Sequence, residues 1–210
     1  MIKILIADDH AILRRGLKEI LVRELEGAIF GEAGNAQQVV TRVQSQVWDL
    51  IILDINMPGR SGFDLLGDLR QLRPELPVLV LSVHSEDQYA KRALRAGAAG
   101  YLNKETAPKE LVKAVRKVLA GGRYVSEAFA EKLAMDLGAE VVPVPHEKLS
   151  AREFEVMRMI GSGKTIGQIA GELHLGVTTV STHRARILKK MGMANNAELM
   201  RYVLANRLID

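Results

Sequence analysis

The 210-residue sequence contains no cysteine, and this absence removes a whole group of functions. It excludes a disulfide scaffold, a thiol nucleophile and a cysteine-based zinc or iron–sulfur site. The longest apolar runs, such as 50–53 and 78–81, are far shorter than the roughly 18 residues that a membrane span requires. Met1 is followed by a strand-like segment rather than by a basic stretch and a longer apolar segment, so we expect no secretory signal. We therefore expect a cytoplasmic protein with no membrane partner.

The overall composition is that of a folded protein, and its charge is unevenly distributed. Hydrophobic residues make up 48% of the chain and charged residues 26%, which disfavours disordered and low-complexity classes. At roughly 150 residues per domain, this length suits one large domain or two small ones. Residues 1–122 carry 17 basic and 15 acidic side chains, whereas residues 146–210 carry 10 basic and 6 acidic ones. The C-terminal end therefore has the larger basic excess per residue, which would suit contact with a polyanion.

The first part of the chain, up to about residue 122, has the pattern of an α/β domain. Short apolar runs alternate with segments of helical period, as in repeated βα units on a parallel sheet. The central runs are apolar on both faces, as burial between two layers of helices requires. Gly97 is placed to end the fourth helix and Pro108 to begin the fifth. The predicted strands are 2–7, 28–33, 50–54, 78–82 and 100–103, and the predicted helices are 12–24, 37–46, 62–72, 88–96 and 108–120.

The chain then changes character. A predicted helix over 126–137 is followed by residues 138–145, where two prolines separated by one residue cannot continue a helix. From Leu149 onward every apolar repeat has helical period, and Ser150 with Glu153 forms a capping box. We therefore predict a first domain over 1–122, a linker with a helix over 123–146, and an all-α domain over 147–210.

Polar side chains stand where ligands of an open parallel sheet collect, at the carboxyl ends of the strands. Asp8 and Asp9 follow the first strand, Asp54 ends the third, Ser82 ends the fourth and Lys104 follows the fifth. Converging carboxylates repel one another unless a cation is bound, and carboxylates with an open water shell suit Mg²⁺. Lys104 could pair with a transferred phosphoryl oxygen and Ser82 could donate its hydroxyl to another. These residues make Asp54 a candidate nucleophile that becomes an aspartyl phosphate.

Each of these positions taken singly is more often a helix cap or a solvated loop residue, but the full set resembles the receiver domain of two-component response regulators. The resemblance covers residues 1 to about 122 and implies a flavodoxin-like, doubly wound parallel sheet of strand order 2-1-3-4-5. It also implies that the Asn56 carbonyl is a metal ligand beside Asp8, Asp9 and Asp54. The segment Met57-Pro58-Gly59 corresponds to the family's loop after the nucleophile.

The same resemblance implies a switch. Phosphate on Asp54 would pull Ser82 inward, Tyr101 would follow, and the surface formed by the fourth and fifth units would change. The alternative for Tyr101 is a partly exposed aromatic at the sheet edge. His10 and His84 fall near this pocket and suggest a transition-metal site, against the more common reading of solvated loop histidines.

The C-terminal part predicts a helix-turn-helix. Thr165 and Gln168 form a second capping box, which opens the first helix of a pair, and 174–176 form a short turn containing glycine. No acidic residue occurs between Val177 and Ala197. The predicted inward stripe of the second helix consists of Val177, Val180, Ile187, Leu188 and Met191. A basic helix face is by itself usually a solvated face.

The order of residues in this part favours DNA binding. The segments 149–156, Ile169-Ala170 and 179–183 resemble the LuxR/NarL-type helix-turn-helix, a compact four-helix DNA-binding domain, over about residues 147–210. By resemblance, the base-facing candidates are Ser181, Thr182 and Ala185, and the phosphate contacts are Thr178, Thr179, Arg186 and Lys189. His183 is then a packed residue of the helix surface, and the last helix is the dimerisation end.

Two positions depart from that family's pattern. Ser181 stands where the family commonly has lysine, and Gly176 stands where a serine or threonine often caps the recognition helix. Glycine is a tolerable N-cap. Loss of a lysine should remove one phosphate or guanine contact.

Together the two resemblances imply a response regulator of the NarL/LuxR (FixJ) type, a phosphorylation-controlled transcription factor. A partner histidine kinase would pass its phosphoryl group to Asp54 with Mg²⁺, and the helix-turn-helix domain would be released to form a homodimer on double-stranded promoter DNA and to engage RNA polymerase. The protein would not be an enzyme beyond its own phosphoryl acceptance and hydrolysis at Asp54.

Two alternatives from other classes stay open at this point. A phosphatase of the haloacid-dehalogenase type also uses an aspartate nucleophile, but its chemistry needs a second aspartate where this chain has Asn56. A constitutive DNA-binding protein could instead keep the receiver as a dimerisation scaffold, although the intact acidic pocket argues against this.

Overall fold

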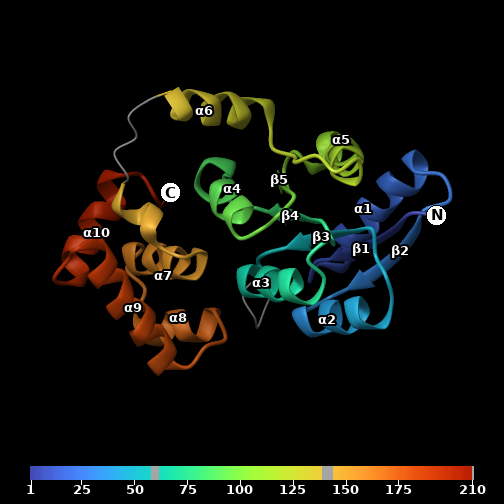
Figure 1. The fold of residues 1–210 in the computed structure, drawn as a ribbon. Helices are drawn as coiled ribbons and strands as arrows, with labels where there is room; N and C mark the ends of the chain where they lie inside the picture. The colour runs from blue at the N-terminus through green and yellow to red at the C-terminus, as the bar shows by residue number, and fades with distance from the viewer. Residues whose placement is uncertain (58–61, 139–143, 210) are drawn as a thin grey trace. The chain divides into compact units, whose positions relative to one another are not determined.

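The computed structural model describes residues 1–57, 62–138 and 144–209. It divides into two compact units, Met1–Gly138 and Ala139–Asp210. Pro58 and Gly59 of the expected loop lie outside the described residues, as does most of the proline-containing linker segment. Figure 1 shows the sheet with its helices in the first unit and a cluster of helices in the second.

The first unit is built on a five-stranded, fully parallel sheet of order β2-β1-β3-β4-β5. This confirms the expected strand order and the α/β class. The last three predicted strands agree with the structure to the residue, and the first two each begin one residue later. The strands are β1 (Lys3–Ala7), β2 (Ile29–Ala33), β3 (Leu50–Asp54), β4 (Val78–Ser82) and β5 (Gly100–Asn103).

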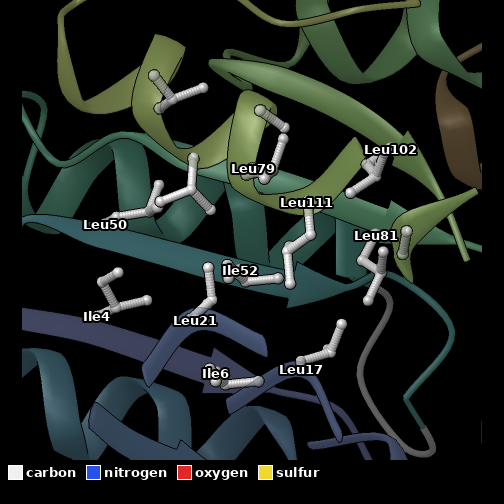
Figure 2. Packing of buried hydrophobic residues seen from close by; sticks show 14 of the residues in the cluster. Ile4, Ile6, Leu17, Leu21, Leu50, Ile52, Leu79, Leu81, Leu102 and Leu111 are labelled. Atoms are coloured by element: carbon white, nitrogen blue, oxygen red, sulfur yellow. The ribbon is translucent and has the colours of Figure 1, made fainter. Parts of the chain in front are cut away.

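The core lies on both faces of this sheet, since every residue of β3 and β4 is buried. On one face, α1 (Ala11–Glu24) and α5 (Ala107–Leu119) cover the alternate strand residues, as Figure 2 shows for Leu17, Leu21 and Leu111. Figure 1 places α2 (Ala36–Ser45) and α3 (Gly62–Leu72) on the opposite side of the sheet. Burial on two sides explains the continuous apolar runs in the sequence.

The remaining helices of the first unit are α4 (Glu86–Arg95) and α6 (Glu127–Gly138). Helix α4 begins two residues earlier than predicted, and the acidic pair Glu86 and Asp87 in its first turn suits the positive end of the helix dipole. Gly97 has a φ of 100° just after α4, and Pro108 lies in the first turn of α5, as the sequence predicted.

The second unit is all-α, as expected. It contains the 3₁₀ turn η1 (Pro145–Lys148) and the helices α7 (Ala151–Gly161), α8 (Ile166–Glu172), α9 (Val177–Met191) and α10 (Asn196–Ala205). Both predicted capping boxes are present, at the starts of α7 and α8. The helices bury Phe154, Met157, Ile160, Ile169, Val180, Ile187, Leu199 and Val203.

The prediction that Val177 belongs to the inward stripe of α9 is wrong. Its side chain is 57% exposed, whereas Val180, Ile187 and Met191 are buried. Val177 is the first residue of the helix, and at 100° per residue it lies about 60° away from Val180 around the axis. Among the described helices, none combines the length and the apolarity that a bilayer crossing demands.

Candidate functional site

The carboxyl ends of β1, β3 and β5 bring two carboxylates and an ammonium into direct contact. Asp8 follows β1, Asp54 ends β3, and the side chains of both are completely buried. Lys104, just after β5, places its Nζ 2.6 Å from Asp54 Oδ2 and 2.7 Å from Asp8 Oδ2. Ser82 at the end of β4 is also buried, and its carbonyl accepts a hydrogen bond from Lys104 N (2.8 Å). Four of the five positions that the sequence predicted thus meet at the carboxyl ends of the strands, and Asp9 follows Asp8 directly in the chain.

The electrostatics of this pocket follow from its burial. Burial raises the pKa of Asp54 above its ordinary value, although hydrogen bonds from Lys104 and from the Asn56 N–H (2.8 Å) act in the opposite direction. Burial also disfavours the charged Lys104, but its hydrogen bonds to Asp54 and Asp8 outweigh this and raise the pKa of the ammonium. The pocket therefore holds two buried carboxylates against one ammonium, and a bound cation would offset the remaining negative charge.

The donor set fits a hard divalent cation. Ligand atoms of Asp8, Asp9, His10 and Asp54 all lie within 4.8 Å of one another. Asp8 Oδ2 lies 2.7 Å from Lys104 Nζ, and Asp9 Oδ1 lies 2.8 Å from His10 Nδ1. Carboxylate oxygens gathered in this way suit the oxygen-rich coordination of Mg²⁺.

Tyr101 is buried, so the alternative of a partly exposed edge aromatic does not apply. Its hydroxyl donates to the carbonyl of His84 (2.8 Å), which also accepts from Asn103 Nδ2 (3.0 Å). The His84 N–H in turn donates to Ser82 Oγ (3.1 Å). Burial raises the pKa of the Tyr101 phenol well above its ordinary value, so it stays a neutral donor. A continuous set of contacts thus joins Ser82 to Tyr101 through the segment after β4.

The two histidines near the pocket differ in their surroundings. The His84 ring stacks on Tyr89 with 4.3 Å between the ring centroids, so His84 is not a simple solvated loop residue. His10 is largely exposed, but its Nδ1 lies 2.8 Å from Asp9 Oδ1 and 3.2 Å from Asp8 Oδ1. His10 therefore belongs to the rim of the acidic cluster rather than to bulk solvent.

Helix α9 presents the predicted DNA-facing residues on its surface. The residues Thr178, Thr179, Ser181, Thr182, Ala185, Arg186 and Lys189 are all exposed. Gly176 is the N-cap of α9 and makes no side-chain capping hydrogen bond, in keeping with the departure noted in the sequence. His183 is half-buried.

Comparison with known proteins decides the family. Residues 4–116 match the response regulator receiver domain, and residues 147–203 match the bacterial regulatory proteins of the luxR family. The chain is a response regulator with a LuxR-type DNA-binding domain. Its whole length aligns with the response regulator UvrY of Escherichia coli K12, 31% identical over 212 residues and 97% of that protein. It aligns equally with the response regulator GacA of Pseudomonas aeruginosa PAO1, 32% identical and covering 99% of that protein.

Solved structures agree with this assignment. RcsB from Salmonella enterica serovar Typhimurium, bound to the promoter rprA in the presence of the phosphomimetic BeF₃⁻, matches with a TM-score of 0.68 and 25% identity. The match covers 97% of this chain and 98% of that one. This response regulator is therefore a DNA-binding transcriptional regulator of the two-component type, as the sequence predicted.

The structure of this response regulator also adds residues that sequence reasoning missed. Arg14 donates from Nη1 to the carbonyl of Asp8 (2.6 Å) and thereby holds the segment after β1 in place. Asn103 Nδ2 donates to the His84 carbonyl. The position of Asn103 at a strand end, directly before Lys104, is the sequence feature that could have identified it. In the second unit, Lys190 Nζ donates to the buried Glu153 (2.6 Å). The two residues are 37 positions apart in the chain, so no local sequence pattern predicts this contact.

Proposed function

We propose that Asp54 is the phosphoacceptor of this response regulator and that a partner histidine kinase is the donor. In the transfer, an Asp54 carboxylate oxygen attacks the phosphorus, a new O–P bond forms, and the N–P bond to the kinase histidine breaks. The contacts of Lys104 with Asp54 and Asp8, at 2.6 and 2.7 Å, are the observation that carries this proposal. An ammonium in this position can pair with the carboxylate before the transfer and with a phosphoryl oxygen during and after it.

The remaining pocket residues take the roles that their chemistry suits. Mg²⁺ would be held by the carboxylates of Asp8, Asp9 and Asp54 and by the Asn56 carbonyl. When bound, it would neutralise charge on the phosphoryl oxygens. Ser82 would donate its hydroxyl to a phosphoryl oxygen, with Tyr101 following as the switch residue. The protein would catalyse only its own phosphorylation and hydrolysis at Asp54, with no separate substrate.

The output is proposed to be binding of a homodimer to double-stranded promoter DNA in the cytoplasm, with contact to RNA polymerase. Ser181, Thr182 and Ala185 would face bases, and Thr178, Thr179, Arg186 and Lys189 would contact phosphates. Leu204 on α10 is 61% exposed and is a candidate for the dimer contact. The family matches at 4–116 and 147–203 support a receiver domain over 1–122, a linker over 123–146 and a DNA-binding domain over 147–210.

Capture of fragmented genomic DNA tests the proposal. The purified full chain is incubated with Mg²⁺ with and without a small phosphodonor, and the retained fragments are sequenced. We expect specific fragments mainly with the donor, and we expect Asp54→Asn to abolish the difference. Intact-mass measurement of the same samples must show one added phosphoryl group on the unaltered chain alone.

Other outcomes distinguish the alternatives. Equal binding of the same fragments by Asp54→Asn would leave a DNA-binding protein whose receiver is a scaffold. Sustained turnover of phosphate esters would support the phosphatase alternative, against which Asn56 stands in the place of a second aspartate.

A further inference from the structure

The first two turns of the exposed face of α9 contain none of the side chains that bind a base edge through two hydrogen bonds. Thr178, Ser181, Thr182 and Ala185 recur at helical spacing and form one exposed stripe. Arginine or lysine reads guanine and asparagine or glutamine reads adenine in the major groove, whereas small methyl-bearing residues contact the thymine methyl. The first two turns of this face therefore offer methyl groups and hydroxyls only.

Two cations beside this stripe are engaged elsewhere in the same unit. Arg184 donates from Nε to Asn196 Oδ1 at 2.6 Å, at the start of α10. Lys190 donates from Nζ to Glu153 Oε2 at 2.6 Å, on α7. Arg186 is exposed next to the stripe, and Lys189 is exposed one turn after Ala185, at the C-terminal end of the same face.

Thr182 has its hydroxyl proton committed as well. Its Oγ1 donates to the carbonyl of Thr178 at 2.9 Å, one turn earlier on α9. The side chain can then offer a methyl group and an accepting oxygen, but no further donor. Val177, exposed at the first turn, adds a second apolar group at the end of α9 that would enter the groove.

We propose that α9 reads its DNA half-site through thymine methyl groups, with Thr182 and Ala185 contacting A·T pairs, rather than through hydrogen bonds to guanine. This inference rests on the proposed DNA-facing surface of α9. Lys189 and Arg186 then supply affinity without sequence preference, and the specificity comes from apolar contact with the C5-methyl groups.

Selection from a random double-stranded library tests this, using the full chain with Mg²⁺ and phosphodonor. We expect A·T pairs at the positions under Thr182 and Ala185. Replacing the thymine there by uracil should weaken binding about fourfold per methyl group, the value of one methylene-sized apolar contact. Thr182→Ser, which keeps the hydroxyl and lacks the methyl, should bind thymine and uracil sites equally at its position.

Two variants serve as matched controls. Lys189→Ala should weaken binding to all sequences alike and reduce its salt dependence, while leaving the uracil effect intact. Ala185→Lys should move the preferred base at its position toward guanine. A selected half-site with guanine under Thr182 and Ala185, or one indifferent to uracil, overturns this inference but leaves the DNA interface standing. Retention of no specific sequence overturns both.

A second, independent observation concerns the segment after α5. Residues 124–132, here termed the clasp, comprise the segment before α6 and the first turns of that helix, and Tyr124 pairs with β5, which is an edge strand of the sheet. Tyr101 N donates to Tyr124 O (2.9 Å) and Tyr124 N donates to Ala99 O (3.0 Å), so the clasp extends the sheet at this edge. A Cβ at Gly100 would lie 2.8 Å from Tyr124 O, and the glycine thus permits the approach.

Side chains and one main-chain N–H of the clasp contact both helices that flank β5. Tyr124 OH donates to Glu110 on α5 (2.7 Å), and Ser126 N donates to Glu86 in the first turn of α4 (2.8 Å). Lys132 lies 2.9 Å from Asp87, also in the first turn of α4. Phe129, which lies between Ser126 and Lys132 in the sequence, is buried. The contacts of Ser126 and Lys132 therefore depend on the position of the first turn of α4.

The start of α4 is also where the contacts from Ser82 lead. Ser82 holds the His84 N–H, and Tyr101 OH holds the His84 carbonyl two residues before Glu86. The main-chain N–H of Tyr101 in turn donates to the carbonyl of Tyr124. A movement of Ser82 toward a phosphoryl group would displace both attachments of the clasp at once.

We infer that phosphorylation of Asp54 loosens the clasp from β5 and α4 and thereby frees α6, the helix that precedes the DNA-binding unit in sequence. This inference rests on Asp54 being the phosphoacceptor. It makes Tyr101 a positioning residue that acts through its hydroxyl on the segment before α4 and through its main chain on Tyr124.

Amide hydrogen exchange of the full chain in the presence of Mg²⁺ tests it, with and without a small phosphodonor. We expect exchange of the Tyr124 and Ser126 amides to accelerate about tenfold or more on activation, while amides of β1 and β3 stay protected. Tyr101→Phe should reduce this response although Asp54 still takes up phosphate. Gly100→Ala should expose the same amides without activation.

The outcomes separate this inference from the proposed function. Unchanged protection at Tyr124 and Ser126 in a sample whose Asp54 is shown by mass to be phosphorylated overturns the clasp and leaves the phosphoacceptor in place. Failure of Asp54 to take up phosphate overturns both.

Discussion

Lys104 Nζ lies 2.6 Å from Asp54 Oδ2, although 50 residues separate the two in the chain. The contact pairs a fixed positive charge with the carboxylate that we propose as phosphoacceptor, and Asp8 shares the same ammonium at 2.7 Å. The folded protein has therefore placed the charge needed during phosphoryl transfer before any phosphate arrives.

Removing this ammonium should leave two buried carboxylates without their cation. We expect Lys104→Ala to lower the free energy of unfolding by about 3 kcal/mol in the presence of a chelator, the scale of a broken buried ion pair. Mg²⁺ should restore more stability to this variant than to the unaltered chain, because the metal replaces the lost charge. Denaturant unfolding with and without Mg²⁺ measures both effects, and an equal response to Mg²⁺ in the two proteins would contradict the prediction.

The raised pKa of Asp54 makes its ionisation unfavourable to folding in the absence of metal. The folded protein binds this proton more tightly than the unfolded chain does, so the associated stability is present at low pH. It is lost as the pH rises from 3.8 through the raised value. Asp54→Asn, which cannot ionise, should therefore gain stability relative to the unaltered chain as the pH rises through this window. Unfolding curves in chelator across that range test it, and a stability difference independent of pH would refute it.

Glu153 should give the second unit the opposite pH dependence. Burial opposes its charge, but hydrogen bonds from Lys190 and from the Ser150 N–H outweigh burial and lower the pKa of this carboxyl. The stability it contributes is present above its ordinary pKa of 4.5 and is lost as the pH falls through the lowered value. Glu153→Gln should flatten this part of the profile. Thermal unfolding of the second unit, followed by circular dichroism from neutral to acid pH, provides the measurement.

Gly176 can be improved as a helix cap. It has extended backbone angles at the N-cap of α9, and a Cβ there would meet Thr179 Oγ1 at an ordinary 3.7 Å. We expect Gly176→Ser to stabilise the second unit by a few tenths of a kcal/mol, roughly the advantage of serine over glycine at this position. Gly192, at φ 67° after the same helix, is the matched control, and Gly192→Ala should cost about 1 kcal/mol. A destabilised Gly176→Ser protein would show that α9 begins differently.

The sequence predicted the secondary structure closely because its signals are local. The capping boxes at Ser150 and Thr165, the left-handed Gly97 and the apolar runs of β3 and β4 depend on neighbours within a few residues. Val177 was misjudged because periodicity does not show where a helix end extends beyond its core. The full burial of Tyr101 could not be predicted either, and neither could its hydrogen bonds to His84 and Tyr124, which come from other parts of the chain.

The amino-acid pattern was sufficient to predict the two-domain class, the order of the strands through the family resemblance, and the set of polar residues at the strand ends. These properties follow from periodicity and from the rule that parallel strands present their carboxyl ends at one edge. The contacts of Lys104 with Asp54 and Asp8, of Lys190 with Glu153 and of Tyr124 with β5 arise only when the chain is folded. Such contacts join residues far apart in the chain, and packing of the whole domain fixes their distances, which no local pattern encodes.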